Sequence, residues 1–432
     1  MKIYPAKQLE GILTLNGDKS ISHRAAMISA IADGETRIEN FSTSADCAST
    51  LDCLERLGVR IRRENSIVFV KGVGKTGLQK PETELDCGNS GTTVRLLSGI
   101  LAGQAFETIL TGDESLSRRP MKRIIEPLLL FGAQIEATEN RLPLRIFGKN
   151  PLSSIEYAPA IASAQVKSCV LLAGLNAGAE TYFIEKTPTR DHTERMLRWF
   201  GAEVESAETK TGKRISVSGA SVLTAKDFRV PSDISSAAFF LVAAGCLENS
   251  DLTVKAVGLN RTRRAVVDVL KAFGANVEIL NEKEVCNETI GDLRVSGSKN
   301  LQTKTGSNII GGEIIANLID EIPILAIFGT QLENGLEIRD AAELRVKESD
   351  RIAAIVENLR RMNAAVEEFP DGFRVEKSDL KGARVDSFGD HRIAMAFAVA
   401  GLLADGETEI TGAESANVSF PEFFRTLESV TK

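Results

Sequence analysis

The residues best suited to chemistry in this sequence are polar clusters that stand directly before apolar, helix-like stretches. The segment NGDKSISHR places Lys19, Ser20 and Arg24 at the start of the apolar run AAMISAI. Ser20 and Arg24 are four residues apart, so they share one face of a helix. Free backbone N–H groups and the positive end of the helix dipole make such a start an anion site. We therefore interpret the cluster as a phosphate site, although a capping serine with solvated cations is the simpler alternative.

Five further segments have the same organisation, with a polar cluster before an apolar helix. They begin near residues 88 (GNSGTTVR), 161 (IASAQVK), 231 (PSDISSAAFF), 318 (LIDEIP) and 390 (DHRIAM). Five cations stand beside these six openings: Lys19, Arg24, Arg95, Lys167 and Arg392. Together they predict that the ligand is a strongly anionic small molecule.

The second opening and a nearby arginine pair add candidates for anion binding. Asn89 and Gly91 stand where a small residue lets the backbone approach a ligand closely. Arg118 and Arg119 follow in SLSRRPM. We expect one of this pair to bind a carboxylate bidentately and the other to be a surface charge.

Two acidic positions are candidates for proton transfer. Asp320 and Glu321 stand in an apolar stretch, where a buried carboxylate must be paired, protonated or functional. We expect one of them to cap the following helix and the other to act as a base. Glu348 lies between Lys347 and Arg351, which we place at helical i, i+4 spacing. A carboxylate between cations stays ionised beside an anion, although charge runs are usually solvated helix faces.

The third and sixth openings remain ambiguous from the residues alone. Ser163 and Gln165 begin a helix that otherwise resembles core, where polar side chains can simply cap the helix. His391 begins the sixth helix, and it is as compatible with a structural histidine as with a catalytic one.

The openings recur about every 70 residues, which indicates an internal repeat. Each apolar helix is followed by a strand, a second helix and a hairpin-like pair, so one unit is predicted as βαβαββ. Five second helices end in a residue suited to a left-handed C-cap: Gly58, Gly132, Gly201, Gly274 and Asn363. In the fourth unit we expect a longer Gly- and Asn-rich excursion between residues 281 and 312.

The repeat also predicts the domain division. The sixth unit stops after its second helix, whereas residues 1–17 contain extended patterns and no helix. We predict that the N-terminal segment completes the last unit. One domain would then comprise residues 18–230, and the other residues 1–17 with 231–432, as a length of 432 residues allows.

Composition excludes several functional classes. A chain with 43% hydrophobic and 26% charged residues is typical of soluble globular proteins. Its net charge of -7 argues against general binding of nucleic acid or anionic membranes. No signal-like segment or membrane-length apolar run is present, so we expect a cytoplasmic protein. The six cysteines lack paired spacing, which favours reduced structural thiols.

No metal or cofactor site is expected. No His, Cys and Asp cluster has metal-ligand spacing. GVGKTG at residues 72–77 matches a dinucleotide fingerprint, but the segment after it contains a proline and opens no apolar helix. The same segment lacks the first glycine of a P-loop, since Phe69 stands there.

Eight motifs together carry a resemblance to a known family. In order along the whole chain they are NGDKSISHR, GNSGTT, SLSRRPM, SAQVK, PSDISSAAFF, LIDEIP, LRVKESDR and GDHRIAM. The set closely resembles the 5-enolpyruvylshikimate-3-phosphate synthase family. The resemblance implies an α/β (α+β) fold of two closing domains, each of three βαβαββ units with helices buried inside sheets. It also implies transfer of the enolpyruvyl group of phosphoenolpyruvate to the 5-hydroxyl of shikimate 3-phosphate, without a cofactor. We expect a monomer, because the sequence has no evident exposed interface pattern.

The resemblance assigns roles residue by residue. Shikimate 3-phosphate would be held by Lys19, Ser20, Arg24, Ser163, Ala164, Gln165, Arg190, Asp320 and Lys347. Phosphoenolpyruvate would be held by Lys19, Asn89, Gly91, Arg119, Gln165, Arg351 and Arg392. Asp320 would act at the attacking hydroxyl, and Glu348 with Lys19 would transfer the proton at the methylene carbon.

Two positions depart from the family pattern, and two other functions were weighed. Leu96 stands where some members have proline, and Val418 where some have a phosphate-binding lysine. Gly91 is unsubstituted, which favours glyphosate sensitivity. One alternative is the related UDP-N-acetylglucosamine enolpyruvyl transferase, but its reactive loop cysteine is missing from residues 112–121, and Ser20 stands where it has asparagine. The other alternative is a noncatalytic repeat scaffold, which would not need acids among cations.

Overall fold

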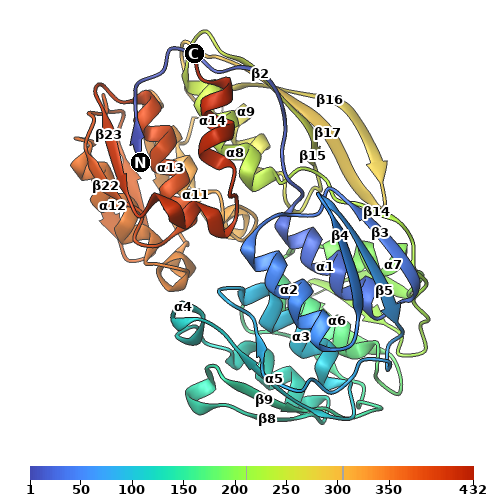
Figure 1. Cartoon of the computed structure of the whole chain (residues 1–432). Coiled ribbons are helices and arrows are strands. Elements are labelled where there is room, and N and C mark those ends of the chain that lie inside the picture. Colours follow the sequence, from blue (N-terminus) through green and yellow to red (C-terminus); the bar gives the residue numbers. More distant parts are fainter. Residues whose placement is uncertain (211, 304–305) are drawn as a thin grey trace. The chain divides into compact units, whose positions relative to one another are not determined.

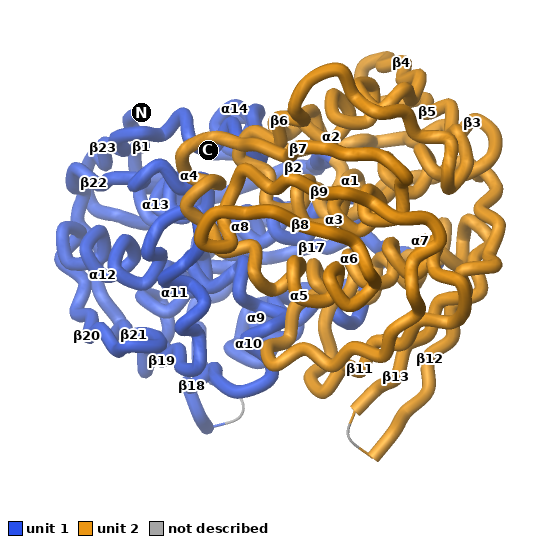
Figure 2. Tube along the Cα trace, turned by 90° about the horizontal axis from the view of Figure 1, so that it is seen from below, with its two compact units in different colours: residues 1–16, 231–284, 289–432 blue, residues 17–230, 285–288 orange. Residues whose placement is uncertain are grey.

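The computed structural model describes residues 1–210, 212–303 and 306–432, which fall into two compact units. Unit 1 comprises residues 1–16, 231–284 and 289–432. Unit 2 comprises residues 17–230 together with the hairpin tip at residues 285–288 (Figure 2). The main chain therefore passes from one unit to the other after Asn16 and again after Val230.

Unit 2 contains three copies of one α/β repeat. The first has α1 (Lys19–Ala30), β3 (Asp33–Glu39), α2 (Ala45–Arg56), β4 (Arg60–Glu64) and β5 (Ile67–Val73). The second has β6 (Leu85–Asp86), α3 (Gly91–Ala102), β7 (Glu107–Thr111), the short α4 (Glu114–Ser117), α5 (Lys122–Leu130), β8 (Gln134–Glu136) and β9 (Leu144–Phe147). The third has β10 (Glu156–Tyr157), α6 (Ala164–Gly174), β11 (Thr181–Glu185), α7 (His192–Trp199), β12 (Val204–Thr209) and β13 (Gly212–Val217).

The three sheets of unit 2 share one topology. Their strand orders are β14-β3-β5-β4, β6-β7-β9-β8 and β10-β11-β13-β12. In each sheet the first pair of strands is parallel and the other pairs are antiparallel. β14 (Phe228–Arg229) follows the third repeat in the chain but pairs with β3, at Phe228 and Ile38. The last strand of the unit therefore supplies the missing first strand of its first repeat.

Unit 1 repeats the plan three more times. Its fourth repeat has α8 (Ile234–Cys246), β15 (Asp251–Gly258), α9 (Ala265–Ala272), β16 (Asn276–Val285) and β17 (Glu288–Ser296). The fifth has β18 (Ile309–Ile310), α11 (Ile322–Gly329), β19 (Leu336–Ile338), α12 (Arg351–Arg361), β20 (Val366–Phe369) and β21 (Gly372–Val375). The sixth has β22 (Arg384–Asp386), α13 (His391–Leu403), β23 (Thr408–Thr411) and α14 (Phe423–Val430).

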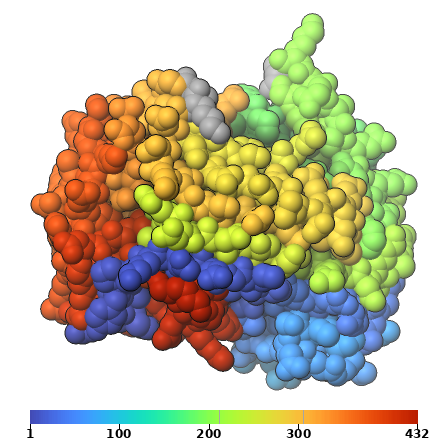
Figure 3. Space-filling model, turned by 90° about the horizontal axis from the view of Figure 1, so that it is seen from above, coloured from blue at the N-terminus to red at the C-terminus, as the bar shows by residue number. Residues whose placement is uncertain are grey.

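The N-terminal segment contributes to two sheets of unit 1. β1 (Lys2–Ile3) pairs antiparallel with β23 in the sheet of the sixth repeat. β2 (Glu10–Thr14) pairs in parallel with β15, in the sheet of the fourth repeat. The space-filling view in Figure 3 shows this dark-blue segment at the surface beside red C-terminal residues. The sequence pattern predicts a role for the N-terminal segment in the sixth repeat, but it does not predict that β2 also joins the sheet of the fourth repeat.

The first helix of each repeat is buried and the sheets surround it. α8 and α11 consist almost wholly of buried residues, and a helix that is apolar on all sides is stable only inside a core. α8, α11 and α13 pack against one another in unit 1 (Figure 1), as α3 packs against α1 and α6 in unit 2. This confirms the predicted fold class, in which helices are buried inside sheets.

The ends of the helices explain several recurring glycines. The five predicted C-cap positions all have positive φ, from Asn363 at 63° to Gly201 at 97°, which confirms the left-handed C-caps.

Gly72, from the segment GVGKTG, lies where a Cβ atom would come within 2.1 Å of the Ala32 carbonyl oxygen. A glycine at position 72 therefore lets this backbone pack closely against the segment that follows α1. This packing explains the glycine of the nucleotide-like motif without a nucleotide.

The expected excursion between residues 281 and 312 is regular in part and irregular in part. Residues 297–303 and 306–308 form neither helix nor strand, and residues 304–305 lie outside the described residues. β16 and β17 extend as one long hairpin, so residues 281–285 and 288–296 are regular strand rather than irregular loop. Among the described residues, no helix is both long and apolar enough to cross a bilayer.

Candidate active site

Side-chain caps define the N-termini of five of the six buried helices. The caps are Asp18 (α1), Ser90 (α3), Ser163 (α6), Asp233 (α8) and Asp390 (α13), and each accepts a hydrogen bond from a backbone N–H in the first turn. α11 is the exception, since Glu321 occupies its N-cap position without a side-chain cap bond. The expectation that Asp320 or Glu321 caps α11 is therefore wrong. Tertiary ion pairs hold these two carboxylates instead.

Lys19 and Arg24 are held differently at the start of α1. Lys19 Nζ lies 2.8 Å from Asp46 Oδ2 of α2, and its side chain is 19% exposed. Arg24 is buried, and its Nη1 donates to the backbone oxygen of Ser20 at 2.8 Å. Ser20 and Arg24 thus lie on one helical face, as predicted. Lys19 keeps access to solvent, whereas Arg24 is fixed by its surroundings.

The third repeat completes the environment of Arg24. Arg24 Nε donates to Thr193 Oγ1 and Nη2 donates to Ser168 Oγ, both at 2.7 Å. Its pKa is lowered to about 10, first by burial and then by the neighbouring charge of Arg190, while Glu194 opposes the shift. Two neighbouring guanidinium groups repel each other, so this place favours an added anion such as a phosphate dianion.

The second opening brings another group of predicted residues together. Arg119 Nη2 donates to Asn89 Oδ1 at 2.7 Å. A Cβ atom on Gly91 would come within 2.6 Å of Arg95 Nη1 and 3.6 Å of Arg119 Nη1. Arg95 Nη1 also donates to Gln165 Oε1 at 2.9 Å, which links α3 to α6. These contacts place Asn89, Gly91, Arg119 and Gln165 in one cationic cluster.

The structure distinguishes the two adjacent arginines. Arg118 forms an ion pair with Glu114, and its side chain is 73% exposed. Arg119 turns instead toward Asn89. Arg118 is thus the surface charge of the pair, and Arg119 is the one available to a carboxylate.

Lys167 has a structural role, contrary to its inclusion among the cations of the anion site. Its side chain is fully buried, and Nζ lies 2.8 Å from both Glu185 Oε1 and Glu194 Oε1. Although burial opposes its charge, these two carboxylates raise its pKa. The ammonium is already neutralised by two anions, so it does not attract a third. Ser163 and Ala164, at the start of the same helix, remain partly exposed.

In unit 1, Arg351 stands at the start of α12, and three acidic side chains lie around its guanidinium group. It is 1% exposed, with Nη2 donating to Glu348 Oε2 at 2.6 Å and Nε donating to Asp390 Oδ2 at 2.8 Å. Its Nη1 lies 3.7 Å from Asp320 Oδ1. Although burial opposes the charge, Asp390 and Glu348 raise the pKa of Arg351. The guanidinium is therefore a permanent cation in a fixed position.

Arg392 approaches Asp320 from α13. Its Nη1 donates to the backbone oxygen of Asp320 at 2.7 Å, and its Nε lies 3.7 Å from Asp320 Oδ1. The Asp320 side chain is 19% exposed and that of Glu348 is 21% exposed, so solvent reaches both carboxylates. Asp320 therefore has two cationic neighbours and remains accessible to solvent.

The predicted helical spacing of Lys347 and Arg351 is wrong. A 3₁₀ helix ends at Val346 and α12 begins at Arg351, so residues 347–350 form a bend. Asp350, the N-cap of α12, breaks the pattern by accepting a hydrogen bond from the Ala353 N–H. Lys347 Nζ consequently donates to Glu343 Oε1 at 2.9 Å instead of lying beside Arg351 on a helix.

Several supporting residues were missed because no local pattern marks them. Asp46 holds Lys19, and it comes from the first turn of an ordinary amphipathic helix. Arg263 and Ser235 both bind Glu321, 58 and 86 residues away in the chain. The apolar surroundings of Glu321 were the one available signal, since a buried carboxylate needs a cation. Leu96, one of the two departures, is fully buried in α3.

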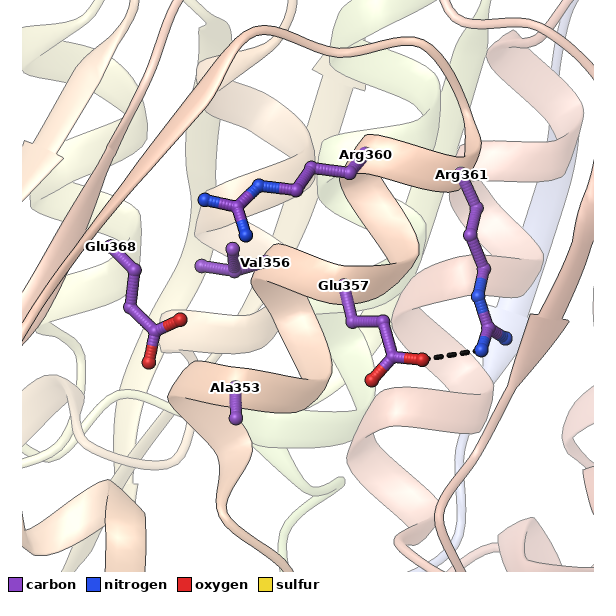
Figure 4. A pocket seen from close by; sticks show the side chains of 6 residues that line it. All are labelled: Ala353, Val356, Glu357, Arg360, Arg361 and Glu368. Carbon is purple, nitrogen blue, oxygen red and sulfur yellow. Dashed lines mark hydrogen bonds and ion pairs between the residues drawn. The ribbon is translucent and has the colours of Figure 1, made fainter.

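One cavity of about 500 Å³ is lined by none of the predicted site residues. It is on the outer face of α12 and is lined by Ala353, Val356, Glu357, Arg360, Arg361 and Glu368 (Figure 4). Arg361 is paired with Glu357, and Glu368 binds Arg345. Its two arginines are matched by two carboxylates, so the cavity has no excess charge to select an anion.

Two units of three βαβαββ repeats, with cations gathered at the starts of their buried helices, define an enolpyruvyl transferase fold. The family model described as EPSP synthase (3-phosphoshikimate 1-carboxyvinyltransferase) matches residues 3–427. The chain belongs to this family, and it is a transferase.

Relatives and solved structures agree with the family match. A 3-phosphoshikimate 1-carboxyvinyltransferase of Solibacter usitatus is 52% identical over 100% of this chain and 99% of its own. A protein of the same name from Koribacter versatilis is 49% identical over 100% of this chain and 99% of its own. The solved EPSP synthase of Acinetobacter baumannii has a TM-score of 0.88 and 42% identity, and covers 100% of this chain and 98% of its own.

Proposed function

We propose that this protein transfers the enolpyruvyl group of phosphoenolpyruvate to the 5-hydroxyl of shikimate 3-phosphate and releases phosphate. The reaction belongs to the shikimate pathway, which leads to chorismate and the aromatic amino acids. Family membership and the names of relatives at about 50% identity support this function. The structural observation that carries it is the carboxylate of Asp320, with Oδ1 3.7 Å from both Arg351 Nη1 and Arg392 Nε.

Both substrates are polyanions, and the cations divide between them in our proposal. Shikimate 3-phosphate is held by Lys19, Ser20, Arg24, Ser163, Ala164, Gln165, Arg190, Asp320 and Lys347. Phosphoenolpyruvate is held by Lys19, Asn89, Gly91, Arg119, Gln165, Arg351 and Arg392. The closeness of Arg24 to Arg190, and of Arg95 and Arg119 to Gly91, supports this division because each place brings two guanidinium groups together.

The addition step needs a base and an acid. Asp320 accepts the proton of the 5-hydroxyl as its oxygen bonds to C2 of phosphoenolpyruvate. The Lys19 ammonium supplies a proton to C3, which becomes a methyl group, and Glu348 takes part in this transfer. The product of this step is a tetrahedral intermediate that still carries the phosphate, and the arginines stabilise its negative charge.

Elimination reverses the proton movement. The C2–O bond to phosphate breaks, and phosphate leaves with the proton that Asp320 had accepted. The methyl group returns its proton to the pair formed by Lys19 and Glu348, so that the vinyl double bond forms again. Lys19 suits both steps, since its ammonium is fixed by Asp46 and still reaches solvent. No redox change occurs, so the residues of this chain are sufficient for the proton transfers.

The decisive experiment measures inorganic phosphate released from phosphoenolpyruvate. Shikimate 3-phosphate and UDP-N-acetylglucosamine are offered separately as acceptors. We expect release only with shikimate 3-phosphate. Release only with the sugar nucleotide would favour the related transferase, and no release with either acceptor would favour a noncatalytic scaffold.

Two substitutions test the assigned proton transfers. Asp320→Asn and Glu348→Gln keep the shape of each side chain but remove the group that exchanges a proton. Each should lower kcat by about a hundredfold or more while substrate binding largely survives. Near-normal turnover in either variant would remove that residue from the mechanism.

Other properties also remain proposals for this chain. We propose a cytoplasmic monomer whose domains are residues 18–230 and residues 1–17 with 231–432. The division of the structure after Asn16 and Val230 supports this domain assignment. Glyphosate sensitivity is supported by the unsubstituted Gly91 and is tested by inhibition assays against phosphoenolpyruvate.

A further inference from the structure

Glu321 is a fully buried carboxylate next to the proposed base in the chain, and no step of the mechanism uses it. Its side chain is 0% exposed. Arg263 Nη1 donates to both of its carboxylate oxygens, at 3.0 and 3.1 Å. Ser235 Oγ donates to Glu321 Oε1, and Arg263 Nη2 donates to Ser235 Oγ. These three side chains form a closed buried network.

The network joins three elements of unit 1. Ser235 lies in the first turn of α8, whose polar start otherwise has no chemical role. Arg263 directly precedes Arg264, the N-cap of α9, and Glu321 directly precedes the first residue of α11. A contact shared by three elements restricts each of them, so the position of Glu321 is set by the tertiary fold.

Glu321 is also linked to the proposed active site. It adjoins Asp320 in the chain, and its Oε1 lies 3.9 Å from Arg392 Nη1. The same Arg392 nitrogen donates to the backbone oxygen of Asp320 at 2.7 Å. Arg392 therefore lies between a fixed carboxylate and the proposed base.

We propose that Glu321 is a positioning residue for Asp320 and Arg392, and that Arg263 and Ser235 hold it in place. This inference rests on the proposed function. An error of about 1 Å in the placement of a reacting group can cost a hundredfold in rate. Without the Glu321 charge, Arg392 loses an anion that orients it, and α11 loses the ion pair that fixes its first turn beside Asp320.

The first test is the charge-removing substitution Glu321→Gln. We expect kcat to fall at least about tenfold and KM for phosphoenolpyruvate to rise about tenfold, because Asp320 and Arg392 both lose their alignment. Calorimetric titration of shikimate 3-phosphate alone should give a Kd within about twofold of the wild-type value, since seven of its nine proposed contacts, all except Asp320 and Lys347, lie in unit 2. Equal losses for both substrates would mean general loosening and would overturn the proposal.

A second variant separates positioning from stability. Replacing both partners of a buried ion pair by apolar residues is often neutral or stabilising, whereas removing one is costly. Arg263→Met combined with Glu321→Met should therefore unfold at a urea midpoint near that of the wild type, yet keep the low kcat and raised KM. Wild-type kinetics in this double variant would overturn the proposal.

A neighbouring residue provides the matched control. Within the described part of the chain, Arg264 pairs with two exposed partners, Asp268 and Glu282. Arg264→Gln should keep wild-type kcat and both KM values, and a loss equal to that of Glu321→Gln would overturn the specific role of the buried network. Phosphate release by the wild type tests the proposed function separately, so the two ideas can fail independently.

Discussion

Arg351 and Asp390 form a buried ion pair, with Arg351 Nε donating to Asp390 Oδ2 at 2.8 Å. The other oxygen of Asp390 accepts a hydrogen bond from the Arg392 backbone N–H at 2.9 Å. Although burial opposes its charge, Arg351 lowers the pKa of Asp390. A single ionised carboxylate therefore connects the starts of α12 and α13, which carry two arginines of the proposed phosphoenolpyruvate site.

Replacing Asp390 should be among the most destabilising isosteric changes in unit 1. Asp390→Asn leaves the Arg351 charge less compensated in a buried place, so we expect a loss of about 3–5 kcal/mol in the free energy of unfolding. Urea denaturation measures the loss. Asp350→Asn is the control, because Asp350 caps α12 but is 39% exposed and should cost only about 1 kcal/mol. Similar losses in both variants would contradict the importance of burial.

His23 should make the stability of the protein depend on pH. It is fully buried in α1, and its pKa is lowered to about 3, chiefly by burial. Below pH 6.5 the unfolded chain binds a proton here that the folded protein refuses, so stability falls between about pH 6.5 and pH 3.

Substitution of His23 isolates this effect. His23→Gln should remove a slope of up to about 1.4 kcal/mol per pH unit in that window, and leave the slope above pH 7 unchanged. Urea midpoints of both proteins, measured from pH 4 to pH 8, provide the comparison. Identical slopes would show that His23 is protonated in the folded state.

Gly91→Ala should weaken phosphoenolpyruvate binding without disturbing the fold. The added Cβ atom would meet Arg95 Nη1 at 2.6 Å, and that flexible side chain can move away. Its hydrogen bond to Gln165 would then be lost. We expect KM for phosphoenolpyruvate to rise by about tenfold, since a charged hydrogen bond contributes about 1.5–3 kcal/mol. If both the KM for phosphoenolpyruvate and the thermal midpoint were unchanged, Gly91 would not belong to the phosphoenolpyruvate site.

Lys167→Met should destabilise unit 2. It leaves Glu185 and Glu194 buried without their shared cation, so we expect a cost of about 3–5 kcal/mol in thermal or urea unfolding. Lys75→Met is the control, because Lys75 donates only to the backbone oxygens of Leu175 and Gly219 and is less buried. A cost for Lys167→Met no larger than that of the control would argue against the buried triad.

Much of the fold could be predicted because its signals are local. Five of the six polar openings carry an N-cap within one turn of an apolar helix, and that information spans only a few residues. The C-caps at Gly58 and Asn363 are equally local. By contrast, β14 and β2 pair with strands about 190 and 240 residues away, at β3 and β15. Strands of two to five residues contain too little pattern to identify such partners.

Candidate site residues were found more readily than their roles. Lys19 and Lys167 both follow polar openings, yet two glutamates from β11 and α7 neutralise the buried Lys167, whereas Lys19 pairs with Asp46 and keeps 19% of its side chain exposed. Arg118 and Arg119 are adjacent, and only the geometry shows which one turns toward Asn89. Glu321 shows the same difference. The apolar sequence around it predicts a buried carboxylate, but nothing in that sequence identifies Arg263 and Ser235 as its partners.

By itself, the sequence determined the six repeats, the buried helices, the polar residues at their starts and the family. Hydrophobic periodicity and capping depend on neighbours along the chain, so a linear pattern is sufficient for them. Only the tertiary structure decided which charges neutralise each other and which remain able to meet a ligand. The physical reason is that an ion pair depends on distance and burial, and the chain brings those about by joining residues far apart in sequence, as Glu321 and Arg263 show.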